Sequence, residues 1–143
     1  MAEMTPEQVD AFLVEPRDAV LSVVLPSGRA IGTPVWFLWL GGKAKFQSPT
    51  GTAKTRALRA TGRASLCVHA QRLPAVEYVT LEGPVQEIPF DLESDIGASA
   101  QHYLGERAAE FMNGIQLALD SGKRWASFEL TPTSISSTSR TLL

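Results

Sequence analysis

Short runs of apolar residues alternate with turn residues along most of the chain, a pattern typical of antiparallel β proteins. The turn residues include Pro26-Ser27-Gly28 and Gly41-Gly42, and the runs beside them are rich in β-branched and aromatic residues. The strands expected from this pattern are residues 19–25, 30–40, 43–48, 64–70, 76–88 and 124–131. The sequence therefore predicts a mainly β (α+β) fold, a six-stranded antiparallel barrel with helices packed on its outside.

Helical patterns occupy the stretches between these strands. The expected helices are residues 5–13, 53–60, 91–104 and 106–119. Thr5 and Gln8 have the spacing of a capping box, and Gly62 is typical of the end of the second helix. The serine- and threonine-rich stretch 131–141 is expected to be an edge segment or a frayed end. No repeat or linker interrupts the series, so we expect residues 1–143 to form a single domain.

The predicted strand over residues 30–40 differs from the others. Its central residues, Val35 to Trp39, are apolar on both faces instead of alternating. Such a strand needs cover on both sides, by the barrel interior on one and by a ligand or second subunit on the other. Pro34 indicates a bulge or an edge at that point, because proline donates no hydrogen bond.

Composition excludes several classes of protein. The chain has 143 residues, 44% apolar and 20% charged, as in globular proteins. No apolar run approaches the roughly 20 residues of a membrane helix, and the acidic start is unlike a signal peptide, so we expect a cytoplasmic protein. One cysteine and two histidines argue against a disulfide framework and against a metal site.

Charge is distributed unevenly along the chain. No acidic residue occurs between Asp18 and Glu77. The basic residues of that stretch are Arg29, Lys43, Lys45, Lys54, Arg56, Arg59, Arg63 and Arg72. The pattern predicts that the middle of the chain faces an anion or an acidic partner, unless the acidic flanks fold over it and neutralise it. A nucleic-acid partner is not expected, because the net charge of the chain is -2.

The junction Ser48-Pro49-Thr50-Gly51-Thr52-Ala53-Lys54 is a candidate phosphate site. It lies where a strand is expected to meet a helix, and it combines hydroxyl groups, a glycine and a lysine. Backbone N–H groups at a helix start, hydroxyl donors and a cation are what a phosphate requires. The spacing is not that of a Walker loop, and the same residues are equally typical of ordinary helix capping.

No conventional set of catalytic side chains is evident. His69 and His102 lie in no recognisable motif, and Cys67 has the surroundings of a small buried apolar residue. Glu77 and Glu82 are better interpreted as partners in cross-strand salt bridges than as a catalytic pair. If the protein is an enzyme, a bound cofactor must therefore carry the reaction.

Several separated motifs, taken in order, resemble a known family. They are E-P-R at residues 15–17, P-V-W-F at 34–37, S-x-x-G-T-x-K at 48–54 and V-T-L-E-G at 79–83. The chain resembles the pyridoxamine 5′-phosphate oxidase-like split barrels, in particular their branch of flavin/deazaflavin-dependent oxidoreductases. The resemblance implies a split barrel, a homodimer and two cofactor sites at the subunit interface. The implied cofactor is coenzyme F420, with FMN as the alternative.

The resemblance also implies roles for particular residues. The tricyclic ring would lie against Pro34, Val35 and Trp36. The residues implied for the phosphate or acidic tail are Ser48, Thr50, Gly51, Thr52, Lys54 and Arg56. For Arg59, contact with the same group and a solvated side chain are equally good interpretations. Tyr78 is a candidate on the substrate side, or else a core tyrosine with its hydroxyl at the rim.

The function implied is hydride transfer from coenzyme F420 to an unsaturated small-molecule substrate. The alternatives are an FMN-binding oxidoreductase of the same fold and a non-catalytic carrier of flavin or haem. A haem carrier would need His69 or His102 as an axial ligand. Pyridoxamine phosphate oxidation is disfavoured, because Arg140 does not replace the arginine-bearing segment at the carboxyl terminus of the true oxidases.

Overall fold

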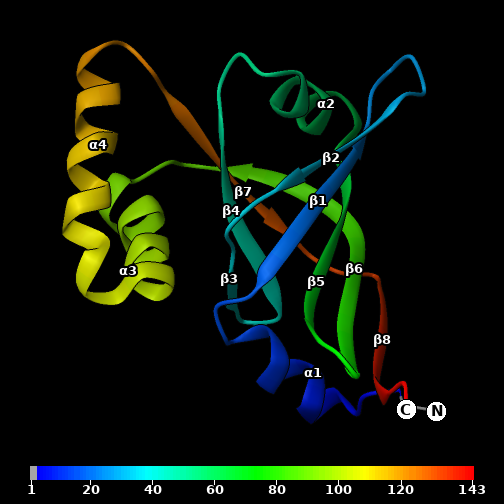
Figure 1. The fold of residues 1–143 in the computed structure, drawn as a ribbon. Coiled ribbons are helices and arrows are strands. Elements are labelled where there is room, and N and C mark those ends of the chain that lie inside the picture. Colours follow the sequence, from blue (N-terminus) through cyan, green and yellow to red (C-terminus); the bar gives the residue numbers. More distant parts are fainter. Residues whose placement is uncertain (1–2) are drawn as a thin grey trace.

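The computed structural model describes residues 3–143, and antiparallel strands dominate it (Figure 1). Eight strands form one sheet in the order β2-β1-β5-β6-β7-β4-β3, and β8 pairs with β6 outside this path. The strands are β1 (Asp18–Val24), β2 (Ala30–Pro34), β3 (Leu38–Leu40), β4 (Lys43–Pro49), β5 (Arg63–Arg72), β6 (Ala75–Ile88), β7 (Trp125–Leu130) and β8 (Ser134–Thr141). The predicted fold class, an antiparallel split barrel with peripheral helices, is confirmed.

The sheet does not close, and its opening falls within a predicted strand. The segment expected to be one strand over residues 30–40 is divided into β2 and β3, which are the two ends of the sheet. Residues 35–37 between them belong to no strand. This break, together with β8 formed by the serine-rich tail, raises the strand number from the expected six to eight. We call residues 35–37 the seam segment.

Helices cover the outside of the barrel, close to where the sequence places them. They are α1 (Pro6–Leu13), α2 (Ala53–Thr61), the π-helical turn Leu92–Gly97, α3 (Ala98–Leu104), a 3-10 turn Gly105–Arg107 and α4 (Ala108–Asp120). Thr5 and Gln8 form the predicted capping box, and Gly62 ends α2 with a φ of 64°. No helix in residues 3–143 is long and apolar enough to cross a membrane.

The barrel interior is filled by the inward side chains of both halves of the sheet. Phe46 of β4 and Phe128 of β7 are register partners, and their ring centroids are 5.7 Å apart. β6 crosses the whole barrel, and Gly83 lies where residues 131–132 pass over it. A Cβ at that position would lie 2.1 Å from the Thr131 carbonyl oxygen, which explains the glycine of the V-T-L-E-G motif.

A buried ion pair ties the π-helical turn to the barrel. Asp95 is only 1% exposed, and Lys45 of β4 contacts its Oδ1 at 2.5 Å. The Ser127 hydroxyl and the Asp91 backbone N–H both donate to Oδ2. Burial opposes ionisation of Asp95, but the bonds from Lys45 and Ser127 outweigh it and hold its pKa below the ordinary value. Asp95 therefore depends on Lys45 for its balancing charge in the fold.

Replacing Lys45 by Met is expected to destabilise the protein by about 3 kcal/mol, because it leaves a buried carboxylate without its cation. Lys43→Met on the same strand is the matched control. Lys43 meets Glu129 at 4.0 Å on the surface, and such exposed pairs contribute about 0–1 kcal/mol. Urea unfolding of both variants measures the difference, and equal effects would contradict the assigned role of Lys45.

Candidate cofactor-binding cleft

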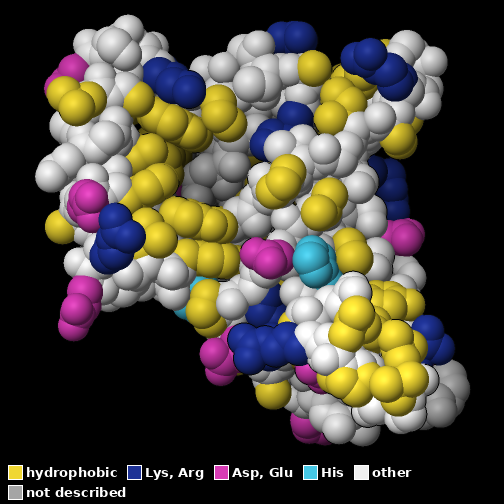
Figure 2. All heavy atoms as spheres, viewed as in Figure 1, with side chains coloured by type: hydrophobic (Ala, Val, Ile, Leu, Met, Phe, Trp, Pro, Cys, Tyr) yellow, Lys and Arg dark blue, Asp and Glu magenta, His cyan; other side chains and the backbone are white. Residues whose placement is uncertain are grey.

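A cleft separates the barrel from the helical pair α3/α4, and apolar side chains line it (Figure 2). One part of it, which we call the apolar cavity, has a volume of about 570 Å³. The residues lining it are Asp18, Ala19, Val20, Pro34, Val35, Trp36, His69 and Phe111. All three residues predicted to contact a cofactor ring, Pro34, Val35 and Trp36, thus lie together in the wall of one cavity.

Trp36 in the seam segment packs against the helical pair. Its ring is stacked on that of Tyr103, with centroids 5.0 Å apart and planes 9° apart, and it meets Phe111 at the same centroid distance. The Tyr103 hydroxyl donates to the Arg17 carbonyl and accepts from the Phe37 backbone N–H. Burial raises the pKa of Tyr103, so the hydroxyl is a neutral donor. These bonds satisfy the backbone where the sheet is interrupted.

A second cavity of about 320 Å³ lies on the other side of the seam segment, and we call it the lysine cavity. It shares Pro34, Val35, Trp36 and Phe111 with the apolar cavity. The further residues lining it are Gln47, Pro49, Lys54, Ile96, Ser99, Ile115 and Trp125. The two cavities therefore have the seam segment and Phe111 as a common wall.

Lys54, in the first turn of α2, is the charged residue of the lysine cavity. It is half-buried and makes no ion pair with any carboxylate in residues 3–143. Burial lowers its pKa below the ordinary lysine value. A bound anion would remove this penalty, because an opposite charge favours the ammonium form.

The hydroxyl groups of the predicted phosphate junction bond mainly to the junction itself. Ser48 and Thr55 join side chain to side chain at 2.6 Å, and Thr52 donates to the Pro49 carbonyl at 3.0 Å and caps α2. Thr50 donates across to the Arg124 carbonyl, at 3.3 Å. Gly51 has a φ of 84°, as its tight turn requires. Capping by Thr52 and bonds to neighbouring groups thus account for these hydroxyls in this structure, and Lys54 is the residue of the predicted junction that lines the cleft.

Three of the other basic residues of the middle segment pair with acidic residues of the flanks, as the alternative of neutralisation expects. Arg59 forms a two-pronged pair with Glu87 on the surface, and Lys45 and Lys43 pair with Asp95 and Glu129. Arg56 donates to the Gly51 carbonyl and is exposed, so it stiffens the junction from outside.

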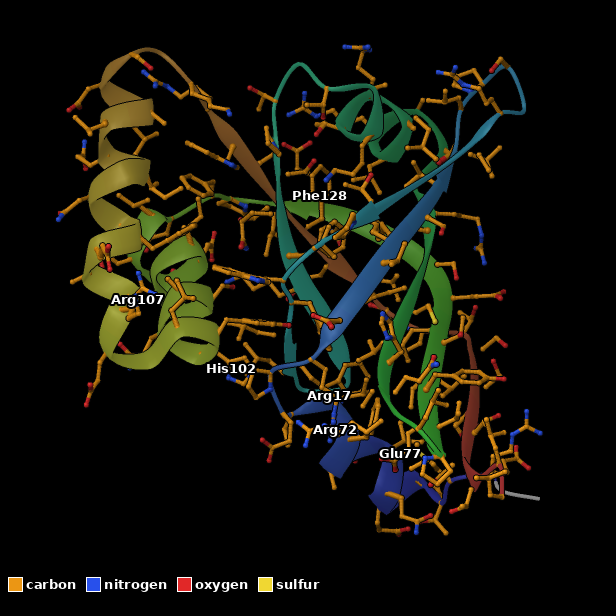
Figure 3. All side chains as sticks on the ribbon, viewed as in Figure 1. Arg17, Arg72, Glu77, His102, Arg107 and Phe128 are labelled. Carbon is orange, nitrogen blue, oxygen red and sulfur yellow. The ribbon has the colours of Figure 1, made fainter. Side chains whose placement is uncertain are left out.

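A polar cavity of about 530 Å³ adjoins the apolar cavity and shares Asp18 and His69 with it. Arg17, Arg72 and Glu77 also line it, where β1, β5 and β6 end near α1 (Figure 3). Tyr78, the predicted substrate-side residue, lines none of these cavities. It is 37% exposed on the outer face of β6, as the register partner of His69.

Three further residues do not occupy the environments expected from sequence. Cys67 is half-buried on the outer sheet face and is not a core residue. Glu77 accepts from the Ser139 hydroxyl, and neither it nor Glu82 forms a salt bridge with a described residue.

The sequence profile of the pyridoxamine 5′-phosphate oxidase family matches residues 5–136. The chain belongs to this family. No curated protein matches the sequence. The family includes flavin-dependent oxidoreductases, and the fold described above is theirs.

Solved structures of related fold cover nearly the whole chain. An FAD-binding protein from Mesorhizobium loti superimposes with a TM-score of 0.69 at 16% identity, covering 97% of each chain. An F420 reductase superimposes with a TM-score of 0.63 at 21% identity, covering 92% of this chain and 98% of that one. The haem storage protein HutZ from Vibrio cholerae superimposes with a TM-score of 0.64 at 18% identity, covering 91% of this chain and 92% of that one. At identities this low, the likeness shows a shared fold and nothing finer.

Sequence reasoning missed the contribution of the helical pair to the cleft. Tyr103, Phe111 and Ser99 were expected on helices outside the barrel, without a site role. The sequence does contain a signal for Asp95 and Ser99. Their i, i+4 spacing places two polar side chains on the same side of the expected helix as the apolar Ile96, which indicates that they are buried with it. The contact of Tyr103 with Trp36 has no local signal.

Tyr103→Phe is expected to lower the free energy of unfolding by about 1–3 kcal/mol, because two backbone groups near the seam segment lose their partner. Phe37 is 1% exposed, so water cannot replace the hydroxyl at its N–H. Tyr78→Phe, which removes an exposed hydroxyl, is the control and should change stability by less than about 0.5 kcal/mol. Chemical denaturation of the two variants makes the comparison, and similar losses would argue against the bridging role.

Proposed function

We propose that this protein binds coenzyme F420 in the cleft and transfers hydride to an unsaturated small-molecule substrate. FMN is the alternative cofactor. The observation that carries the proposal is Lys54, a half-buried cation without an anionic partner among the described residues, at the wall of a cleft that is otherwise mostly apolar. A planar ring with an anionic tail has the chemistry that such a cleft would bind.

The cleft offers separate surroundings for the two parts of such a cofactor. Pro34, Val35 and Trp36 present an apolar surface suited to a flat ring, and Lys54 on the other side of the same segment is suited to a phosphate. Helix α4 adds to this argument, since Phe111 and Ile115 on its cleft side are only half-buried. A ring lying in the cleft would cover them and add hydrophobic stabilisation.

When bound, a deazaflavin supplies two electrons as a hydride and reacts poorly with oxygen, which suits a reductase. The residues of this chain would bind and orient it. Trp36, held by Tyr103 and Phe111, gives the ring a rigid wall, and the surrounding apolar side chains exclude water. The open side of the apolar cavity, bordered by Asp18 and His69, is left for the substrate.

A side-by-side titration with coenzyme F420 and FMN tests the proposal. Trp36 and Trp125 both line the lysine cavity, so quenching of tryptophan fluorescence reports binding directly. Tight binding of coenzyme F420 with weak binding of FMN is expected. The reverse preference would assign flavin redox chemistry, and binding of neither would overturn the proposal. A non-catalytic haem carrier would instead bind haemin, and replacement of His69 or His102 would abolish that binding.

Lys54→Ala is expected to weaken cofactor binding by about 1–3 kcal/mol, the range for a charge-assisted contact, and to leave the fold intact. Lys43→Ala, which removes a surface lysine far along the same cationic segment, should leave the affinity unchanged. Both are measured in the same fluorescence titration. If Lys54→Ala binds the cofactor with unchanged affinity, Lys54 does not hold the anion, and the proposed anion site in this cavity is wrong.

The outer face of the sheet supports a homodimer as part of this proposal. On β1, β5, β6 and β8 most outward side chains near its centre are small and uncharged, and Glu82, the register partner of Ser65, is the charged exception. The small ones are Val20, Ser22, Ser65, Cys67, Thr80 and Ser136. Val20 and Asp18 belong both to this face and to the apolar cavity, so a second subunit seated here would border the cofactor.

Cys67→Arg is expected to convert the proposed dimer to a monomer, because it inserts a large charge between Val20 and Thr80, its small uncharged register partners on this face. Light scattering after size-exclusion chromatography gives the mass, which for one chain is 15.5 kDa. Ser121→Arg, at the exposed end of α4, should remain dimeric. A monomeric wild-type protein, or a dimer that Cys67→Arg leaves intact, would refute this interface.

A further inference from the structure

Ser99 of α3 has a feature that the fold does not explain. It is 3% exposed, yet its hydroxyl has no hydrogen-bond partner among the described residues. The residue lines the lysine cavity, opposite the barrel wall that carries Gln47. Most buried hydroxyls are hydrogen-bonded, and one left without a partner destabilises the fold. The Ser99 hydroxyl rotates about a single bond, so a polar group of a ligand in this cavity would give it the missing partner.

Gln47 of β4 places a second polar group in the same cavity. Its Nε2 donates to the Ser127 hydroxyl at 3.3 Å, and that hydroxyl donates to Asp95 at 2.6 Å. This chain of bonds starts at the buried ion pair and fixes the amide, which leaves Oε1 as a hydrogen-bond acceptor. No described residue donates to that oxygen.

The three polar side chains of the lysine cavity differ in what they can bind. Lys54 donates and carries charge, Gln47 offers a carbonyl oxygen, and Ser99 both donates and accepts. A second anionic group would be repelled by the Gln47 oxygen, whereas a hydroxyl group would donate to it. The set beside Lys54 therefore suits a polyhydroxylated chain that ends in an anion.

We propose that Ser99, together with Gln47, binds the polyol chain of the cofactor. This inference rests on the proposed function, because both FMN and coenzyme F420 carry a ribityl chain between the ring and the phosphate. With the ring against the seam segment and the phosphate at Lys54, the polyol lies in the lysine cavity. Helix α3 then contributes directly to cofactor recognition, in addition to forming the wall of the cleft.

The test compares ligands that have the polyol with ligands that lack it. The pairs are riboflavin against lumiflavin, and 8-hydroxy-5-deazariboflavin against its 10-methyl analogue. Ser99→Ala is expected to lower the affinity for the polyol-bearing member by about 5-fold, as for one net hydrogen bond, and to leave the other unchanged. Ser121→Ala, whose hydroxyl donates to the Ala118 carbonyl at the far end of α4, is the matched control.

A stability measurement separates recognition from a structural role. Without ligand, the melting temperature of Ser99→Ala should equal or exceed that of the wild type, because the change removes an unpartnered buried hydroxyl. Ser127→Ala, by contrast, should melt lower, because its hydroxyl donates to a buried carboxylate. A lower melting temperature for Ser99→Ala, or an equal loss of affinity for both members of a pair, would overturn the assignment to the polyol.

The outcomes also distinguish this inference from the function on which it rests. Wild-type protein that binds none of these ligands, FMN or coenzyme F420 would refute the proposed function and the inference together. Wild-type protein that binds them, with Ser99→Ala showing the same affinity for riboflavin or its deaza counterpart, would refute the inference alone.

Discussion

Asp95 cannot remain buried without a cation, and this requirement holds the helical pair against the barrel. Lys45 and Ser127 supply its partners from β4 and β7, two strands of the barrel wall. The π-helical turn that carries Asp95 leads directly into α3. The second attachment is the stack of Trp36 on Tyr103. Between these two points α3 and α4 stand away from the sheet, and the cleft is the space that they enclose (Figure 1).

The opening in the sheet gives the cleft the side chains that could bind a ligand. Residues 35–37 belong to no strand, and Val35 and Trp36 line the cleft, while Phe37 is buried in the barrel core. The Tyr103 hydroxyl bonds to the backbone there, which removes part of the cost of interrupting a sheet. Apolar walls therefore surround the segment on both sides, while Lys54 is the cation in the wall of its smaller cavity.

Local patterns in the sequence predict most of the elements and the composition of the candidate ring wall. The caps at Thr5 and Gly62 and the turns between hairpin strands depend on neighbouring residues, so they are visible in the chain itself. The division of residues 30–40 is not, because it depends on Trp36 meeting Tyr103 from another part of the chain. Lys45 and Lys43 look alike in sequence, and the burial of Asp95 alone distinguishes them. Capping by Thr52 was one of the two roles that the sequence allowed the phosphate junction, whereas the bond from Thr50 to the Arg124 carbonyl depends on a distant part of the chain.

The position of β7 has a consequence for how the chain folds. β7 pairs with β4 on one side and with residues 85–88 of β6 on the other. The half of the barrel that contains β3 and β4 is therefore joined to β6 by a strand near the carboxyl end of the chain. Pairings between residues so distant in sequence form slowly, since loop closure precedes any gain from contacts. Until residues 125–130 are synthesised, Phe46 has no cover from Phe128, and the inner faces of β4 and β6 are open to other chains. A nascent chain paused before this point presents apolar strand surface, which makes it a natural client for chaperones during translation.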